Sequence, residues 1–519
     1  MRRALRYGIL IVCLLIIGGG IYLAWYVKTL GPRAKDRVIS ALEDRFDADV
    51  DLKSLDISLF PRPSVSGEQL SIRHKNWTDP RPLIYIGKFY AATDFLTLLN
   101  RRNHVDIVRL NGLAIRIPPR GLSLGKNTSA TPDTTHLRFA IQTIVADGTQ
   151  LQIDPKQQGK DPLIFDIEKL TLHSVGPGKA MAFVAKLTNA KPPGLIDTTG
   201  SFGPWQRDDP RSTPVSGDYR FQNANLGVFA GISGILASKG TYKGVLQNIE
   251  VNGATETPEF SLKRGGDSVA LSTQFHSIVD GTDGDTLLQP VDAHFLSSEF
   301  ICKGGVVHEP GAPGKTVSLD ATSRHARMED ILTLVVGGAT PFVTGDVNFK
   351  SMIVIPPGNQ DVIDKLRLDG QFALLSAKFA SRKVQERLLT LSNRARGISK
   401  DEAESGQGPN MVASDLRGRF KLENGVARFS RLSFSVPGAL ISLAGSYGLQ
   451  SGKIDMHGVF RMQATLSQTQ SGVKQLLLMP LNKLFEKDGA GFQAPLDITG
   501  TKDHPTIGIT VFHKTFTIH

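Results

Sequence analysis

Cysteine is nearly absent from this sequence, and the side chains that usually carry catalysis form no motif in the structural context that catalysis requires. The 519 residues include only two cysteines, Cys13 and Cys302, so disulfides cannot provide the framework of the fold. The twelve histidines occur in no HExxH motif and no CxxC pair is present, which argues against the common zinc sites. The GxSxG pattern of serine hydrolases occurs once, at Gly121–Gly125, but the residues after it have no helical period, so the strand–turn–helix context of a catalytic serine is missing. We therefore predict that the protein is not an enzyme and holds no metal or other cofactor.

Long runs of one charge are also missing, although the net charge is +11. Lysine and arginine are spread along the chain without interleaved stacking aromatics, a pattern that argues against nucleic acid as a partner. A weak attraction to anionic lipid head groups fits the same charge better. Tyrosine and tryptophan are scarce, with 8 and 3 residues, whereas phenylalanine has 26. Most of the aromatic surface is therefore expected to stay away from water.

One long uncharged run, Tyr7–Val27, stands near the start of the chain. It is long enough to cross a bilayer core of ~30 Å as a helix. Tyr22, Trp25 and Tyr26 lie at its distal end, where the aromatic belt of a membrane anchor meets the lipid–water boundary. A cleaved signal peptide is the alternative, but the run exceeds the usual ~7–15 apolar residues and lacks small cleavage-site residues. The sequence therefore predicts a tail at residues 1–6 and a retained transmembrane anchor at 7–27.

The orientation of this anchor does not follow from charge alone. Arg2, Arg3 and Arg6 precede the apolar run, while Lys28, Arg33, Lys35 and Arg37 follow it. Large downstream domains are translocated largely regardless of such charges. We expect a single-pass protein with the short tail in the cytoplasm and the body outside it.

A short amphipathic helix is predicted directly after the anchor, over Arg33–Phe46. Val38, Leu42 and Phe46 recur at a spacing of four residues, with charged residues on the other sides. Two placements remain open for this helix. It lies beside the membrane, or it caps the first strands of the body.

From Asp49 onward the apolar residues alternate with polar ones, which indicates β-strands. Glycine, proline, asparagine and aspartate separate the strands, as in an all-β chain. Beyond a first strand that begins near Val50, the predicted strands include Leu70–Arg73, Leu83–Ile86, Val105–Leu110, Leu113–Ile117, Ile141–Val145, Leu151–Ile153, Leu163–Ile167 and Met181–Leu187, and several more within Gly234–Leu262. Three helices are predicted to interrupt this pattern, near Arg324–Val336, Ser376–Arg396 and Val473–Lys487.

The clearest strand pattern lies in Asp415–Tyr447, a predicted meander with turns at residues 423–425 and 437–438. Its strands are apolar on one face, and the candidate inward residues are Phe420, Leu422, Leu432, Phe434, Val436, Ile441 and Leu443. Such a face must be covered by a second layer, by closure of the sheet or by a ligand. Three helices are few for so many strands. The face is therefore either a lipid-binding groove or the packed core of an ordinary sandwich or barrel.

Five stretches follow the predicted anchor in the order Val50–His74, Gly240–Leu262, Leu366–Ser392, Asp415–Leu449 and Pro495–Ile509. No single stretch is a sharp signature, because each consists of β periodicity and glycine turns. Their order, together with the anchor, resembles the AsmA-like family of membrane-anchored periplasmic proteins, and the resemblance covers most of the body.

The resemblance implies a mainly β fold, in which an N-terminal transmembrane helix precedes an elongated, curled antiparallel β-sheet, groove-like, with a few covering helices. It implies an N-terminal β-rich region at residues 29–262 and a C-terminal β-groove region at 263–519. The anchor would lie in a bacterial inner membrane, with the body in the periplasm. Larger relatives are similar to bridge-like lipid-transfer proteins, whose curled sheets enclose acyl chains.

The implied function is binding of a phospholipid or other envelope lipid in the β-groove, as part of phospholipid transport and outer-membrane biogenesis. Because the chain is short for a continuous bridge between two membranes, it would need a partner protein or act as a shuttle. The alternative is a periplasmic scaffold or assembly factor for outer-membrane proteins, with envelope proteins as partners and no lipid transfer.

Overall fold

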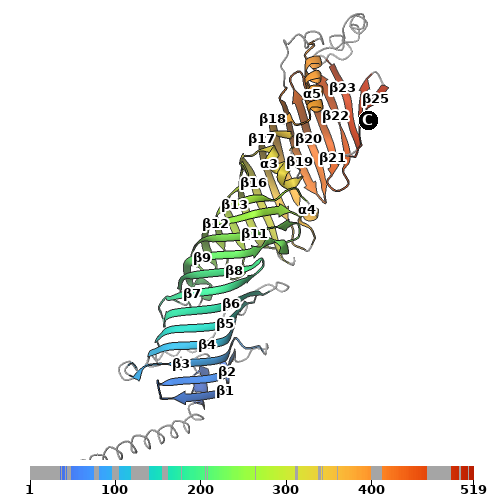
Figure 1. Ribbon diagram of the computed structural model, residues 1–519. Helices are drawn as coiled ribbons and strands as arrows, with labels where there is room; N and C mark the ends of the chain where they lie inside the picture. Colours follow the sequence, from blue (N-terminus) through green and yellow to red (C-terminus); the bar gives the residue numbers. More distant parts are fainter. Residues whose placement is uncertain are drawn as a thin grey trace, which may run out of the picture. The chain divides into compact units, whose positions relative to one another are not determined.

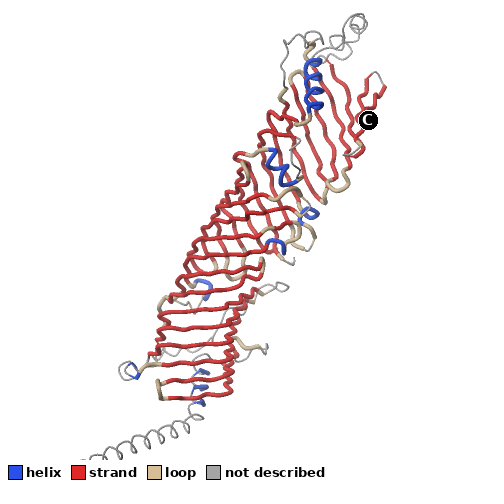
Figure 2. Tube along the Cα trace, viewed as in Figure 1, coloured by secondary structure: helices blue, strands red, loops and turns tan. Residues whose placement is uncertain are grey.

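A computed structural model describes the chain over residues 48–74, 81–95, 104–117, 140–154, 162–309, 314–336, 341–398, 412–463, 492–511 and 514–518, apart from a few single positions, together with parts of 35–43 and Thr97. The described residues are mainly β, with few helices, as the sequence predicts (Figures 1 and 2). No helix among them is long and apolar enough to cross a membrane. The predicted anchor at 7–27, with Tyr22, Trp25 and Tyr26, lies outside the described residues, as does the predicted helix at Val473–Lys487.

The chain divides into two compact units. The N-terminal unit comprises residues 1–224, 237–253 and 278–285, and the C-terminal unit comprises 225–236, 254–277 and 286–519. Residues 225–285 therefore contribute to both units and contain β10 (Ile232–Ser233), β11 (Ile235–Val245), β12 (Asn248–Leu262) and β13 (Val269–Val279). The sequence-based division after residue 262 stays a prediction.

In the N-terminal unit, each strand pairs with the next one along the chain from β1 to β9. The pairs are antiparallel except β4–β5, which is parallel, so the expectation of a purely antiparallel sheet is wrong at this pair. The strands are β1 (Ala48–Ser58), β2 (Ser64–His74), β3 (Ile84–Ala92), β4 (His104–Ile117), β5 (Ala140–Ile153), β6 (Leu163–Val175), β7 (Met181–Ala190), β8 (Pro193–Phe202) and β9 (Pro214–Asn225).

Strands β4 and β5 are each one continuous strand, although the sequence predicted two short strands for each. The predicted breaks fall at Gly112 and Gly148, which have φ values of 66° and 64°. Glycine adopts this conformation without steric cost, and the two parallel strands keep the same register on both sides of it. The glycines therefore kink a paired strand without ending it.

The amphipathic helix after the predicted anchor caps the first strands. Those residues of 35–43 that the structure describes are helical. Val38, Ile39 and Leu42 pack on a buried cluster in β1 and β2 that includes Leu52, which is 1% exposed. Of the two placements left open by the sequence, the structure shows the one against the strands.

In the C-terminal unit, each strand from β14 to β25 pairs antiparallel with the next, forming a curled meander (Figure 1). The strands are β14 (Thr286–Phe295), β15 (Ser298–His308), β16 (Lys315–His325), β17 (Val343–Ile355), β18 (Arg367–Phe379), β19 (Ser414–Glu423), β20 (Val426–Val436), β21 (Ala439–Gly448), β22 (Lys453–Met462), β23 (Phe492–Thr501), β24 (Pro505–Val511) and β25 (Lys514–Ile518). The helices are α3 (Met328–Val335), α4 (Val362–Lys365) and α5 (Arg382–Ala395).

The two predicted helices of this unit exist but begin later than expected. β16 continues to His325 before α3, and β18 continues to Phe379 before α5. β18 continues past Ser376 through a β-bulge, where the register shifts between Leu374 and Ala377. α5 begins only after Ser381, whose hydroxyl accepts a hydrogen bond from the Val384 N–H at 3.4 Å. Phe379, assigned to the helix from the sequence, therefore belongs to the strand.

Candidate binding face of the C-terminal unit

The seven candidate residues of the meander lie on one face of the C-terminal sheet. Residues directly opposite each other on antiparallel strands point to the same side. Leu432 lies opposite Leu443 and Phe434 opposite Ile441 across β20 and β21. Phe420 and Leu422 belong to the same face, because every second residue of β19, counted from these two, lies opposite an apolar residue of β20. The register therefore places the seven residues on one side of the sheet, and a lipid as their ligand stays a prediction.

A ladder of phenylalanine rings extends this face over β17–β20. Phe420 is the centre of the ladder, with ring centroids 6.5 Å from Phe349, 6.0 Å from Phe372 and 6.3 Å from Phe429. These spacings lie in the range of favourable aromatic pairs. We call Phe349, Phe372, Phe420 and Phe429 the phenylalanine ladder.

Sequence reasoning missed three of these four rings. Phe349 and Phe372 follow the period-two pattern of β17 and β18, which could have revealed them. Phe429 could not be assigned in this way, because it precedes Leu432 by three residues and an odd spacing normally places two residues on opposite faces. A β-bulge between Phe429 and Leu432 adds one residue and brings both to the apolar face.

Gly418 makes room for the ladder. A Cβ atom at this position would lie 2.6 Å from the Phe372 ring and 3.2 Å from a Leu432 methyl carbon. Any larger residue would therefore push the ring away from the sheet. The absence of a side chain at Gly418 lets the phenyl ring lie across β19 beside Phe420.

Helix α5 covers one end of the apolar face. Leu388 and Leu391 of α5 pack on a buried cluster that includes Val412, Val436 and Ala439. Val436 is only 6% exposed, and Phe434 packs against the same cluster. Val436, expected to line an open groove, therefore belongs to a packed core.

Helix α3 covers the other end of the same face, next to the phenylalanine ladder. Met328, Ile331 and Leu332 pack on a buried cluster that contains Val347 and Leu374, which are 4% and 2% exposed. Of the other residues on the face, Leu422 is buried. Phe349 is half-buried and packs against the cluster beneath α3. The remaining residues, between the two helices, are also half-buried, namely Phe372, Phe420, Phe429, Leu432, Ile441 and Leu443. The face thus consists of an incompletely covered centre flanked by two helix-covered cores.

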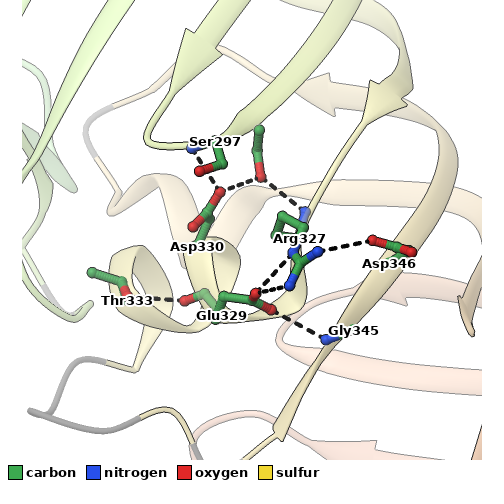
Figure 3. Close-up of polar contacts among 8 residues, drawn as sticks. Ser297, Arg327, Glu329, Asp330, Thr333, Gly345 and Asp346 are labelled. Carbon is green, nitrogen blue, oxygen red and sulfur yellow. Dashed lines mark hydrogen bonds and ion pairs between the residues drawn. The ribbon is translucent and has the colours of Figure 1, made fainter. Parts of the chain in front are cut away.

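A polar network holds α3 on the sheet (Figure 3). The buried carboxylate of Asp330 accepts hydrogen bonds from the Ser297 N–H at 2.9 Å and from the Ser298 hydroxyl at 2.7 Å. The Ser298 oxygen in turn accepts from the Arg327 N–H at 2.9 Å. These contacts tie the first turn of α3 to the β14–β15 turn.

Glu329 adds a second link, from α3 to β17. Its carboxylate accepts from the Gly345 N–H at 3.1 Å and from the Arg327 guanidinium at 2.8 Å. Burial raises the pKa of Glu329, but hydrogen bonds from its own N–H, from Arg327 and from Gly345 outweigh it and leave the pKa below its usual value. The carboxylate therefore stays charged, which also suits the first turn of a helix.

We expect Asp330→Ala to loosen α3 by about 2 kcal/mol, because it leaves the Ser297 and Ser298 donors without their charged acceptor. That loss corresponds to roughly 30-fold faster hydrogen exchange of the α3 amides if they exchange by local opening. The matched control is Asp346→Ala, which removes an exposed ion pair of 3.2 Å with Arg327 in the same network and should change exchange by less than about threefold. Equal acceleration in both variants would contradict the assignment of Asp330 as the anchor of α3.

The N-terminal unit carries an apolar face of its own. Leu110, Ala146 and Leu170 lie opposite one another in turn across β4, β5 and β6. The Phe89 ring lies over Gly67, where a Cβ atom would lie 2.5 Å from the ring. The half-buried state of Leu110 and Leu170 resembles that of the C-terminal face.

The described residues contain no group of three or more histidine, cysteine, aspartate or glutamate side chains that could hold a metal ion. Compared with protein-family models, curated proteins and solved structures, the chain matches none.

Proposed function

We propose that the apolar face of the C-terminal unit binds the acyl chains of an envelope lipid. The observation that carries this proposal is the half-buried centre of the face, with Phe420, Leu432 and Leu443 between the cores under α3 and α5. Residues at the centre of a sheet are normally buried by a second layer. A ligand that supplies this layer explains why apolar side chains are retained there.

The free energy of such binding is favourable for even one chain. Each CH₂ group removed from water contributes about 0.8 kcal/mol. The ladder offers ring faces and the neighbouring strands offer leucine and isoleucine, so the wall of the site is apolar throughout. The polar head group would remain in water at the margin of the sheet.

The remaining parts of the proposal rest on the sequence. The apolar run at 7–27 would place the protein in a bacterial inner membrane as a single-pass protein, and the AsmA-like resemblance would place the body in the periplasm. There the protein would contribute to phospholipid transport and outer-membrane biogenesis. Because its length is short for a bridge between two membranes, we infer a partner protein or a shuttle role.

Photo-crosslinking in the full chain tests the acyl-chain site. One variant carries the photoreactive residue at Leu443, on the apolar face, and the matched control carries it at the next residue of β21, Ala444, which is exposed on the opposite face. After irradiation of membranes, we expect covalently attached phospholipid at position 443 and little at 444, measured by mass spectrometry. Lipid at neither position, or protein partners captured at 443 instead, would refute the lipid site and favour the scaffold function.

A further inference from the structure

The opposite face of the same sheet carries a row of cations. Register places Lys350 of β17 opposite Gln371 of β18, Gln371 opposite Arg419 of β19, and Arg419 opposite Arg431 of β20. All four side chains are exposed. We call Lys350, Gln371, Arg419 and Arg431 the cationic row. It crosses four neighbouring strands directly behind the phenylalanine ladder.

The cations of this row lack the carboxylate partners that neighbouring cations have. Lys421 pairs with Asp369 at 2.9 Å, and Arg417 pairs with Asp415 at 3.4 Å. Within the part of the chain that the structure describes, none of the three cations Lys350, Arg419 and Arg431 forms an ion pair or a side-chain hydrogen bond. Two arginines directly opposite on paired strands repel each other, and no carboxylate among the described residues pairs with either of them.

The sheet is hollowed at the cationic row. A depression of about 990 Å³ is lined by the whole row, by further polar residues that include Asn348 and Ser433, and also by Phe349 and Phe372 of the phenylalanine ladder. A volume near this size is typical of sites for small ligands. The depression and the unpaired cations are separate observations, and they coincide.

From these observations we propose that the cationic row binds a ligand that carries two phosphate groups. Paired strands lie about 4.8 Å apart, so Lys350 and Arg431 are separated by roughly 14 Å along the row. Guanidinium groups bind phosphate oxygens through two parallel hydrogen bonds. Arg419 and Arg431 would bind one phosphate, and the long side chain of Lys350 and the Gln371 amide would extend along the row to bind a second phosphate linked directly to the first.

The cations of this site belong to the face opposite the phenylalanine ladder, so the phosphate contacts differ from those that bind an acyl chain, although Phe349 and Phe372 also line the depression. Its ligand could be the phosphorylated head group of a lipid or a soluble phosphate compound, since both offer the same recognised chemistry. Bound anions would remove the repulsion between the two arginines. The removal of this repulsion adds to the favourable free energy of anion binding.

Titration with inorganic pyrophosphate tests the site in the full chain, held in nanodiscs of neutral lipid at low salt. We expect Arg419→Gln/Arg431→Gln to weaken binding at least 20-fold in calorimetry. The matched control, Arg367→Gln/Lys421→Gln, removes the same charge from two cations that pair with Glu423 and Asp369 and do not line the depression, so it should weaken binding less than threefold. Equal losses, or absence of pyrophosphate binding by the unaltered chain, would overturn the proposal.

Two further measurements complete the test. Without ligand, the Arg419→Gln/Arg431→Gln variant should melt at the same or a higher temperature, because the repulsion is gone; a clear fall would show that the arginines have intramolecular partners and would overturn the site. Vesicles containing phosphatidic acid are then added to the pyrophosphate complex. Competition assigns the site to lipid head groups and lack of competition assigns it to a soluble phosphate, and either result supports the site itself.

Discussion

Phe420→Glu is expected to reduce the phospholipid that co-purifies with the full chain by at least tenfold. Phe420 lies at the centre of the ladder, within 6.0–6.5 Å of three other rings. A carboxylate at this point would have to lose its hydration when an acyl chain covers it, and an unpaired charge in an apolar surrounding is strongly unfavourable. Lipid binding should therefore fail even though a half-buried position tolerates the charge in the unliganded protein.

Phe420→Leu is the matched control for this experiment. It keeps the position apolar and removes only the ring contacts, which contribute about 0.5–1.5 kcal/mol per aromatic pair. We expect this variant to retain at least half of the co-purifying lipid, measured by mass spectrometry of extracts normalised to protein. If leucine removes the lipid as completely as glutamate, the ladder acts in the fold and not in binding.

Leu374→Ala should have the largest effect on stability. This side chain is 2% exposed and lies in the core beneath α3, where removal of the buried methyl groups leaves a cavity. Such substitutions cost about 2–5 kcal/mol. Urea unfolding followed by hydrogen exchange within β17 and β18 would measure the loss in the C-terminal unit itself, since two units need not unfold together.

Leu440→Ala provides the comparison for this second result. Leu440 belongs to the same kind of strand but is 37% exposed, on the face away from the helices. We expect its loss to cost less than about 1 kcal/mol, within the usual range for exposed positions. Equal destabilisation in both variants would show that the core under α3 is no more tightly packed than the open surface.

The sequence predicted the phase of the apolar face correctly, for a physical reason. A strand has a period of two residues, so one buried residue determines which of its neighbours share its face. For this reason all seven candidates of the meander lie together. The same reasoning failed at Phe429, because a bulge changes the period at one point and leaves no trace in the hydrophobic pattern.

Features that depend on contacts distant in the sequence could not be predicted. Nothing in the residues around Val436 indicates that α5, some forty residues earlier, covers it. Likewise, Arg419 and Arg431 form a directly opposed pair only because a bulge sets the register between β19 and β20. The ends of strands were misplaced where glycine kinks a strand without ending it, as at Gly112.

The C-terminal sheet is a simple meander, in which each strand contacts mainly the strands before and after it. Such a sheet can gain or lose strands two at a time. Insertion or removal of one hairpin changes the length of the sheet by about 9–10 Å, while the direction and facing of all later strands are kept. A single inserted strand would instead reverse every strand that follows. Proteins built in this way can adjust the span of an apolar surface through gain or loss of hairpins, without redesign of the rest of the chain.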